Sequence, residues 1–386
     1  MEKKPIILIP GIQGTKLMNI NEKNFKTIWS GIKKYFSNIH KLKLQFDGKS
    51  DAGAENIVER ADVEDLAYSE IVNYLRSIGY RVFIFGYDWR QSNAESAIKL
   101  AELVTKVQAK LNESSINFIT HSMGALVLSA YLKTLKPAQR KKFINKAIFT
   151  VPPFLGSIEA SFNLTIGKSR FINSSDDFRK IGRTFPGLYE LLPVYPNAYT
   201  FQTAASARKF NPFVFSSYWQ QVKNVDRPDT KVKHRLISKR LRDTGKVRDQ
   251  NNLVFDLSKM DAAERKNYLV LVGGGEITKQ KIFVQENKDD LRFYFDYRKF
   301  NDTKQGDGTV SIQSSGIFRN QITTLQLFTT PLEKRADSRF IMADWHAFYL
   351  NNGRVQNILK RFIDPKNHKT LSPNWYESRG GDIEKL

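Results

Sequence analysis

The chain has 386 residues, with 61 Lys or Arg against 39 Asp or Glu, and its formal net charge of +22 predicts attraction to polyanions. Hydrophobic residues make up 41% of the sequence, which is enough for a large core and excludes a wholly disordered chain. The absence of cysteine excludes a disulfide framework, a thiolate metal site and a cysteine nucleophile.

The first aliphatic run, at residues 6–9, predicts a strand that is buried on both faces. The run is too short for the core of a signal peptide, and no stretch of about 18 apolar residues suggests a membrane span. We therefore expect neither a signal peptide nor a transmembrane segment, and a protein that is cytoplasmic or peripheral to a membrane.

The rest of the first half alternates between helical and strand-like spacing of its apolar residues. Strand, helix and strand in this rhythm predict a parallel sheet with right-handed crossovers. The predicted helices are 65–78, 94–111 and 123–135, and the predicted strands are 81–85, 116–120 and 147–151.

After residue 153 the pattern stops, and the sequence becomes irregular, aromatic and basic. It resumes with strands at 268–272, 291–297 and 324–328 and a last helix at 356–363. The sequence therefore predicts one core formed by residues 1–153 and 267–386, with an inserted cap or lid at residues 154–266.

The sharpest chemical signal follows the strand at 116–120, where the sequence reads Thr120-His121-Ser122-Met123-Gly124. A serine between a buried strand and an apolar helix, with glycine two positions later, is typical of a nucleophile elbow. The helix N-terminus at such a turn stabilises negative charge. Thr120 replaces the first glycine of the full pattern, and a buried Ser-Gly helix start without chemistry is the alternative.

A serine nucleophile needs a base, and the sequence offers five histidines. His346 precedes the last predicted helix, at the place where this fold would deliver its base, although a core histidine packed among aromatic residues is the alternative. The other four adjoin the serine or lie in basic and polar segments: His121, His40, His234 and His368.

The acid is expected between the serine and the base in chain order. Asp307 stands between Gly306 and Gly308, which let a loop turn tightly and aim a carboxylate at an imidazole. An Asp-Gly pair is also an ordinary turn signal, and Asp302 and Asp344 stay open as rivals.

An oxyanion hole would take one amide from Met123, the residue after the serine, and one from an early strand-loop. Residues 10–15 follow the first strand and contain two glycines, which allow backbone amides to face a ligand. A phosphate-binding loop is excluded here because neither G-K-[ST] nor G-x-G-x-x-G occurs.

In this order, the segments resemble the lecithin:cholesterol acyltransferase-like family of α/β-hydrolases, which includes lysosomal phospholipase A2 and phospholipid:diacylglycerol acyltransferases. The resemblance covers most of the chain and rests on residues 9–17, 87–90 (Tyr-Asp-Trp-Arg), 120–124, 185–193, 272–275 and 306–310, and on His346.

The resemblance implies an α/β-hydrolase fold, with a mostly parallel sheet, helices on both faces and a lipid-binding cap. It implies Ser122 as nucleophile, Asp307 as acid and His346 as base, with the amides of Ile12 and Met123 as the oxyanion hole. The expected activity is that of a serine lipase, phospholipase or acyltransferase acting on lipid esters through an acyl-serine. No metal or cofactor is expected.

Asp88 and Arg90, beside two large aromatic residues, are most simply an ion pair that supports the site. The basic part of the cap is a candidate for docking on anionic membrane, and a solvated basic loop is the alternative. Its candidate residues are Lys231, Lys233, Arg235, Lys239, Arg240 and Arg242.

Two other functions stay open: a non-lipid serine esterase or thioesterase, and an inactive hydrolase-fold module that binds polyanions. Nucleic acid is not the expected partner, because no nucleic-acid-binding motif is recognisable. The oligomeric state is not predicted.

Overall fold

The structure is a computed structural model. It describes residues 3–19, 27–31, 39–52, 57–167, 176–201, 211–214, 230–249, 253–287, 292–338, 345–364, 366, 376 and 383–386.

Seven strands form the main sheet, in the order β13-β12-β9-β7-β6-β1-β5. Every neighbouring pair is parallel except β12 with β13, which is antiparallel at one edge. The mostly parallel sheet predicted from the sequence is therefore confirmed. The strands are β1 (Ile6–Ile9), β5 (Val82–Ile84), β6 (Ile116–His121), β7 (Ile144–Thr150), β9 (Tyr268–Gly274), β12 (Thr324–Phe328) and β13 (Ile383–Lys385).

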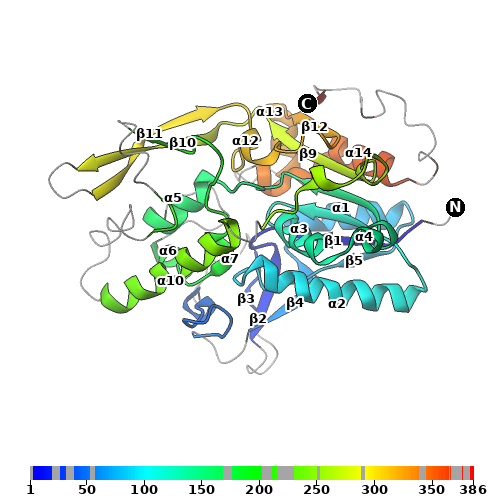
Figure 1. The fold of residues 1–386 in the computed structure, drawn as a ribbon. Coiled ribbons are helices and arrows are strands. Elements are labelled where there is room, and N and C mark those ends of the chain that lie inside the picture. The colour runs from blue at the N-terminus through cyan, green and yellow to red at the C-terminus, as the bar shows by residue number, and fades with distance from the viewer. Residues whose placement is uncertain are drawn as a thin grey trace.

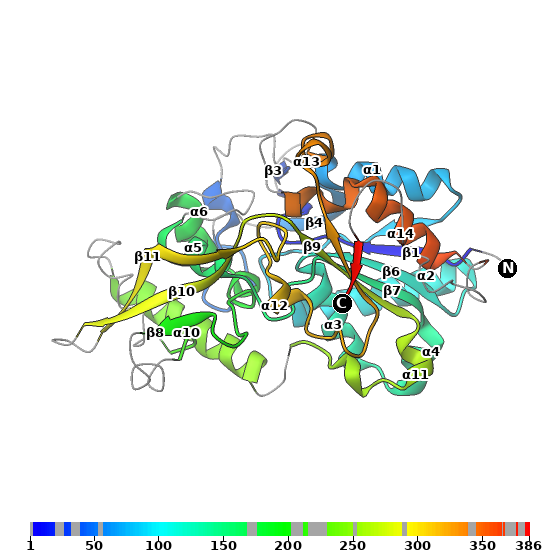
Figure 2. The ribbon, with the colours of Figure 1, turned by 90° about the horizontal axis from the view of Figure 1, so that it is seen from above.

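Helices cover both faces of this sheet (Figures 1 and 2). In β1, Ile7 and Ile9 pack into the core shared with α2 and α3, whereas Ile6 and Leu8 pack into the core shared with α1 and α14. This alternation explains why the strand reads as a continuous aliphatic run. The helices around the sheet are α1 (Asp65–Ser77), α2 (Asn93–Leu111), α3 (Gly124–Thr134), α4 (Pro137–Phe143) and α14 (Gly353–Ile363).

The segment predicted as irregular, residues 154–266, contains regular helices, so that prediction was wrong in this respect. The short helices fall among many aromatic residues and glycines, which obscure their spacing. The helices are α5 (Ile158–Ile166), α6 (Asp176–Gly182), α7 (Pro186–Tyr189), α10 (Thr230–Asp249), η3 (Leu257–Lys259) and α11 (Ala262–Arg265).

Two small sheets complete the fold. One contains β2 (Thr15–Asn19), β3 (Thr27–Trp29) and β4 (Ile57–Val63), and the other contains β8 (Tyr199–Phe201), β10 (Thr278–Asn287) and β11 (Arg292–Thr303). The remaining elements are η1 (Ile39–Leu42), α12 (Ile312–Ser315), α13 (Pro331–Asp337) and η4 (Trp345–Asn351).

The inserted segment leaves and re-enters the main sheet between adjacent strands, because β7 pairs directly with β9. Helices α5, α6, α7 and α10 gather at one end of the molecule with the β10–β11 hairpin (Figure 1). That hairpin pairs with β8 through β10, so it joins residues from both sides of the predicted boundary at 267. The division into core and cap at residues 153 and 267 stays a prediction.

Within the described ranges, we find no helix with the length and apolar character needed to cross a membrane.

Candidate active site

Ser122 lies in a tight turn between β6 and α3. Its φ of 51° is in the left-handed region that a residue other than glycine rarely adopts. A Cβ on Gly124 would lie 2.4 Å from the carbonyl oxygen of Ile9, so only glycine fits two positions after the serine. Gly11 faces the same turn, because a Cβ there would lie 2.8 Å from Cβ of Ser122. The turn is thus pressed against the loop after β1.

Thr120, which replaces the first glycine of the elbow pattern, is fully buried. Its hydroxyl is directed at the backbone of β7, 3.4 Å from the carbonyl oxygen of Ile148. The hydroxyl of Thr150 in turn donates to the carbonyl of Thr120. The larger side chain is therefore accommodated between β6 and β7, and the strained turn at Ser122 is kept.

Three predicted residues come together at this turn. Nε2 of His346 lies 2.8 Å from Oγ of Ser122, and its Nδ1 lies 2.7 Å from Oδ2 of Asp307. All three side chains are more than nine-tenths buried. Ser122 and His346 are 224 positions apart in the chain, so the fold itself assembles this hydrogen-bonded row.

Asp307 is held by backbone amides as well as by His346. Its Oδ1 accepts hydrogen bonds from the amides of Thr309 and Val310, at 2.9 and 2.7 Å. A Cβ on Gly273 of β9 would lie 2.5 Å from Cβ of Asp307. Glycine at that position lets the loop lie directly over the end of β9, which leaves the second carboxylate oxygen for the imidazole.

His121, although next to Ser122, is directed away from it. Its Nδ1 lies 2.7 Å from the hydroxyl of Tyr68, and its Nε2 lies 2.8 Å from the backbone carbonyl of His346. The hydroxyl of Tyr68 also accepts the amide of Gly11, at 2.9 Å. The contacts of Tyr68 and His121 were not predicted from the sequence, because Tyr68 sits among core residues of α1 with nothing local to distinguish it.

The two amides predicted for an oxyanion hole belong to Ile12 and Met123. Among the described residues, no backbone acceptor takes either amide, and Met123 stands at the N-cap of α3. The loop after β1 is shaped by Gln13, whose φ is 64°. The Gln13 side chain is buried, and within the described part of the chain neither of its polar atoms has a hydrogen-bond partner.

The Tyr-Asp-Trp-Arg segment contacts this loop through its aromatic residues. The hydroxyl of Tyr87 donates to the carbonyl of Pro10 at 2.9 Å, and the indole of Trp89 donates to the carbonyl of Thr15 at 3.1 Å. Asp88 and Arg90 form a buried ion pair. The Arg90 guanidinium also donates to Leu42 and Asp51, so the pair holds the neighbouring 42–51 segment.

Of the other histidine and aspartate candidates, the structure describes the side chains of His121 and His40, and neither belongs to the row. His40 is an exposed residue within η1. The side chains of His234 and Asp302, and the whole of Asp344 and His368, lie outside the described residues. No group of three or more His, Asp or Glu side chains that could hold a metal ion occurs in the described part of the chain.

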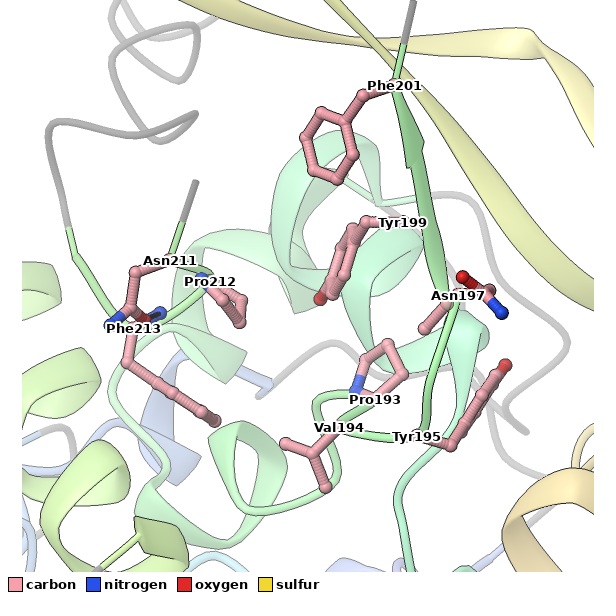
Figure 3. Close-up of a pocket in the computed structure, with 10 residues that line it drawn as sticks. Pro193, Val194, Tyr195, Asn197, Tyr199, Phe201, Asn211, Pro212 and Phe213 are labelled. Atoms are coloured by element: carbon pink, nitrogen blue, oxygen red, sulfur yellow. Dashed lines mark hydrogen bonds between the residues drawn. The ribbon is translucent and has the colours of Figure 1, made fainter. Parts of the chain in front are cut away.

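A pocket of about 370 Å³ lies beside β8, and none of Ser122, Asp307 and His346 lines it. Tyr199 and Phe201 project from β8 toward the side where Pro212 and Phe213 lie (Figure 3). The lining is completed by Pro193, Val194, Tyr195, Asn197, Ala198 and Asn211. The lining combines aromatic and aliphatic side chains with two amide side chains and exposes more polar than apolar surface.

One of the six basic residues predicted to dock on membrane is not available for this role. Arg240 is 2% exposed, and its guanidinium donates to the backbone carbonyls of Gln45, Phe46 and Thr184. Its prediction as a membrane contact was therefore wrong. Arg235 and Arg242 are exposed, Lys239 is partly exposed, and the side chains of Lys231 and Lys233 lie outside the described residues.

The sequence model of the lecithin:cholesterol acyltransferase family matches residues 49–325. The chain belongs to this family. The resemblance predicted from its motifs is therefore confirmed. The matched range includes Ser122 and Asp307 but neither Ile12 nor His346, so the placement of those two residues rests on geometry.

A curated member of this family, "Lecithin-cholesterol acyltransferase-like 4" of Arabidopsis thaliana, is 24% identical over 231 residues. The match covers 49% of this chain and 42% of that protein. The chain thus matches less than half the length of this relative.

The crystal structure of the Tle4–Tli4 complex contains a chain with a similar fold. It superposes with a TM-score of 0.56 at 14% identity and covers 92% of this chain and 96% of that one. The likeness is one of fold. Together with the parallel sheet and the strand-turn-helix at Ser122, it confirms the predicted α/β-hydrolase class.

Proposed function

We propose that this member of the lecithin:cholesterol acyltransferase family is a serine ester hydrolase or O-acyltransferase that acts on lipid esters through an acyl-serine. The observation that carries the proposal is the continuous row from Ser122 through His346 to Asp307, with contacts of 2.8 and 2.7 Å. Nucleophile, base and orienting acid in this geometry are the parts that acyl transfer needs.

In the proposed reaction, Nε2 of His346 takes the proton from Oγ of Ser122 as this oxygen attacks the ester carbonyl carbon. Asp307 holds the imidazole in the required tautomer and stabilises the imidazolium. The carbonyl oxygen becomes an oxyanion and accepts the amides of Ile12 and Met123. Each such donor is typically worth about 3 kcal/mol in the transition state.

The tetrahedral intermediate then expels the alcohol, which takes the proton back from His346, and leaves an acyl-serine. Water or a second alcohol loses its proton to His346 and attacks the acyl carbon. The second tetrahedral intermediate then breaks the bond to Oγ of Ser122, which takes this proton back from His346. Water gives hydrolysis, and an alcohol gives acyl transfer. The same residues serve both outcomes, so the acceptor alone decides between them.

Three features support a lipid ester as substrate over a small polar ester: membership of the family, the aromatic side chains that line the pocket beside β8, and the charge of +22. A pocket of about 370 Å³ is large enough to take part of an apolar chain. We propose a phospholipid or related lipid as substrate and an anionic membrane surface as the place of work.

Labelling with a fluorophosphonate probe tests the proposal. Wild-type protein should be labelled covalently, and Ser122→Ala should not be labelled at all. Ser129→Ala is the matched control, because Ser129 is a buried serine on helix α3, just after the Ser122 turn, and its hydroxyl accepts a hydrogen bond from the amide of Phe255. Labelling of Ser122→Ala at the wild-type level would contradict the assignment.

Esters of increasing acyl length, with and without micelles, separate lipid from non-lipid substrates. We expect the rate to rise with chain length and to rise further when the substrate forms an interface. Added long-chain alcohol should divert acyl groups from water if the protein is a transferase. A preference for short esters that ignores micelles would favour a non-lipid esterase or thioesterase.

A further inference from the structure

Helix α10 has one buried face and one basic exposed face. The buried face carries Ile237, Leu241 and Thr244. The opposite face carries four cationic side chains, which follow one another at spacings of four, three and four residues: Arg235, Lys239, Arg242 and Lys246. Lys239 is partly exposed and the other three are exposed. These spacings put all four on one side of a helix, over a length of about 16 Å.

A short hairpin, residues 43–52, lies against this helix. Its two arms are joined by an antiparallel bridge between Leu44 and Asp51 and by the hydrogen bond from the amide of Gln45 to the carbonyl of Ser50. At the tip, Oδ1 of Asp47 accepts the amides of Lys49 and Ser50 at 2.8 and 2.9 Å. These hydrogen bonds close the turn.

The buried Arg240 fastens the hairpin to the helix. Its Nη1 donates to the carbonyl of Phe46 at 3.1 Å, and its Nη2 donates to the carbonyl of Gln45 at 2.9 Å. A third bond, from Nε to the carbonyl of Thr184, anchors the same guanidinium at the start of α7. Arg240 thus builds a surface from two segments that are nearly 200 residues apart.

Two apolar side chains border the basic stripe. Phe46, at the hairpin tip, is 49% exposed, and Nζ of Lys239 lies 5.7 Å from its ring centroid. Val214 is 44% exposed and follows Phe213, which packs directly on Gly245 of α10. Cations that surround exposed apolar side chains are typical of surfaces that bind lipid interfaces.

The charge of the surface formed by α10 and the hairpin indicates an anionic partner. The described side chains of α10 contain four exposed or partly exposed cations and one acid, Asp243, which pairs with Lys239. The net charge of the face is strongly positive, and the Phe46 side chain at its tip is 49% exposed. A duplex of nucleic acid would use the cations but would leave the exposed Phe46 without an apolar contact.

We propose that α10 and the 43–52 hairpin form one docking surface for an anionic lipid bilayer. The cations Arg235, Lys239, Arg242 and Lys246 meet the head groups, and Phe46 inserts at the interface. This inference rests on the proposed function, because the docking surface would hold the proposed esterase on the lipid bilayer that contains its substrate.

Co-sedimentation with phosphatidylcholine vesicles, with and without phosphatidylglycerol, tests the proposal. Binding is measured in the Ser122→Ala background, so that hydrolysis cannot alter the vesicles. We expect binding that requires phosphatidylglycerol and weakens with salt. Arg242→Glu with Lys246→Glu should weaken it at least about tenfold, and Phe46→Ser should weaken it several-fold.

The matched controls lie on α2, which runs beside the main sheet while α10 lies on the cap (Figure 1). Lys106→Glu with Lys110→Glu makes the same charge change at the same four-residue spacing, and Ile98→Ser removes a side chain that is 59% exposed. Both should leave vesicle binding within about twofold of its starting value.

Equal losses from the α10 and α2 pairs would show that only net charge matters and would overturn the proposal. So would unchanged binding after the α10 substitutions, or tighter binding to a DNA duplex than to anionic vesicles. Hydrolysis of a water-soluble short ester by the wild-type protein is scored separately. If that hydrolysis occurs and vesicle binding fails, the docking surface and the proposed membrane location are wrong, and the serine ester hydrolase activity stands. Vesicle binding without ester hydrolysis would contradict the activity alone.

Discussion

The hydroxyl of Tyr68 lies 2.7 Å from Nδ1 of His121, the residue immediately before Ser122. The same hydroxyl accepts the amide of Gly11, so its own proton is directed to Nδ1 of His121. Nε2 of His121 must then carry the ring proton, which it donates to the carbonyl of His346. Tyr68 thereby links the loop of the proposed oxyanion hole to the turn and to the backbone of the proposed base.

Tyr68→Phe removes the hydroxyl and keeps the ring. We expect kcat for a water-soluble ester to fall about tenfold with KM little changed, because a loss of order 1.4 kcal/mol in positioning would be felt in the chemical step. His121 would be free to take the other tautomer and to release the His346 carbonyl. Steady-state kinetics of the variant check this expectation.

Tyr74→Phe is the matched control for this substitution. Tyr74 lies on the same helix α1, is only partly buried and should have normal kinetics. A rise in KM with unchanged kcat in Tyr68→Phe would assign the residue to substrate binding and would contradict a positioning role.

His121 also predicts how stability depends on pH. Burial, followed by the nearby His346, lowers the pKa of His121 from its ordinary 6.5 to about 3. Below pH 6.5 His121 becomes protonated in the unfolded chain but stays neutral in the folded chain. The contribution of neutral His121 to the free energy of unfolding is therefore fully present above pH 6.5 and is lost as the pH falls toward 3.

We expect the stability difference between wild type and His121→Gln to shrink by about 3 kcal/mol between about pH 7 and about pH 4. Glutamine does not titrate, so the comparison isolates the imidazole. Urea unfolding of both proteins across this range measures the difference. A difference that stays constant with pH would show that His121 is protonated in the folded state.

The sequence predicted the main sheet well, because its strands are aliphatic runs bounded by proline, glycine or charge. The predicted strands at 6–9 and 324–328 have the bounds observed for β1 and β12. The short strands β2, β3 and β4 were missed, because each is only three to seven residues long, and in β2 buried residues alternate with partly exposed ones.

The site was predictable where its residues carry local signals. Ser122 stands in a strand-turn-helix, and Asp307 stands between glycines. Arg240 shows the limit, since composition does not distinguish a buried arginine from an exposed one. Its burial depends on backbone carbonyls at residues 45 and 46, nearly 200 positions away, and only the fold brings them together.

Replacing Gln13 is expected to raise stability and to lower activity. Its carboxamide is buried without a partner among the described residues, which costs about 1–3 kcal/mol. Gln13→Met removes the polar atoms at similar volume, so the midpoint of thermal unfolding should rise. Because Gln13 follows Ile12 in the proposed oxyanion loop, we expect kcat/KM to fall.

Gln326→Met is the control, because Gln326 is equally buried but donates to Gln305 at 3.0 Å. This change should lower the midpoint of unfolding. If both variants lost stability equally, the Gln13 carboxamide would have a structural partner in solution.

A side chain at Gly124 is expected to have a severe packing effect. A Cβ there would lie 2.4 Å from the carbonyl oxygen of Ile9 and 2.6 Å from that of Pro10, and neither backbone atom can move without shifting the turn. We expect Gly124→Ala to destabilise the protein by about 3 kcal/mol and to reduce fluorophosphonate labelling. Gly353→Ala, at the first position of α14, meets no atom within 4 Å and should be neutral or stabilising by up to about 1 kcal/mol. Urea unfolding of the pair measures both, and a Gly124→Ala protein as stable as Gly353→Ala would show that the turn at Ser122 is not pressed against β1.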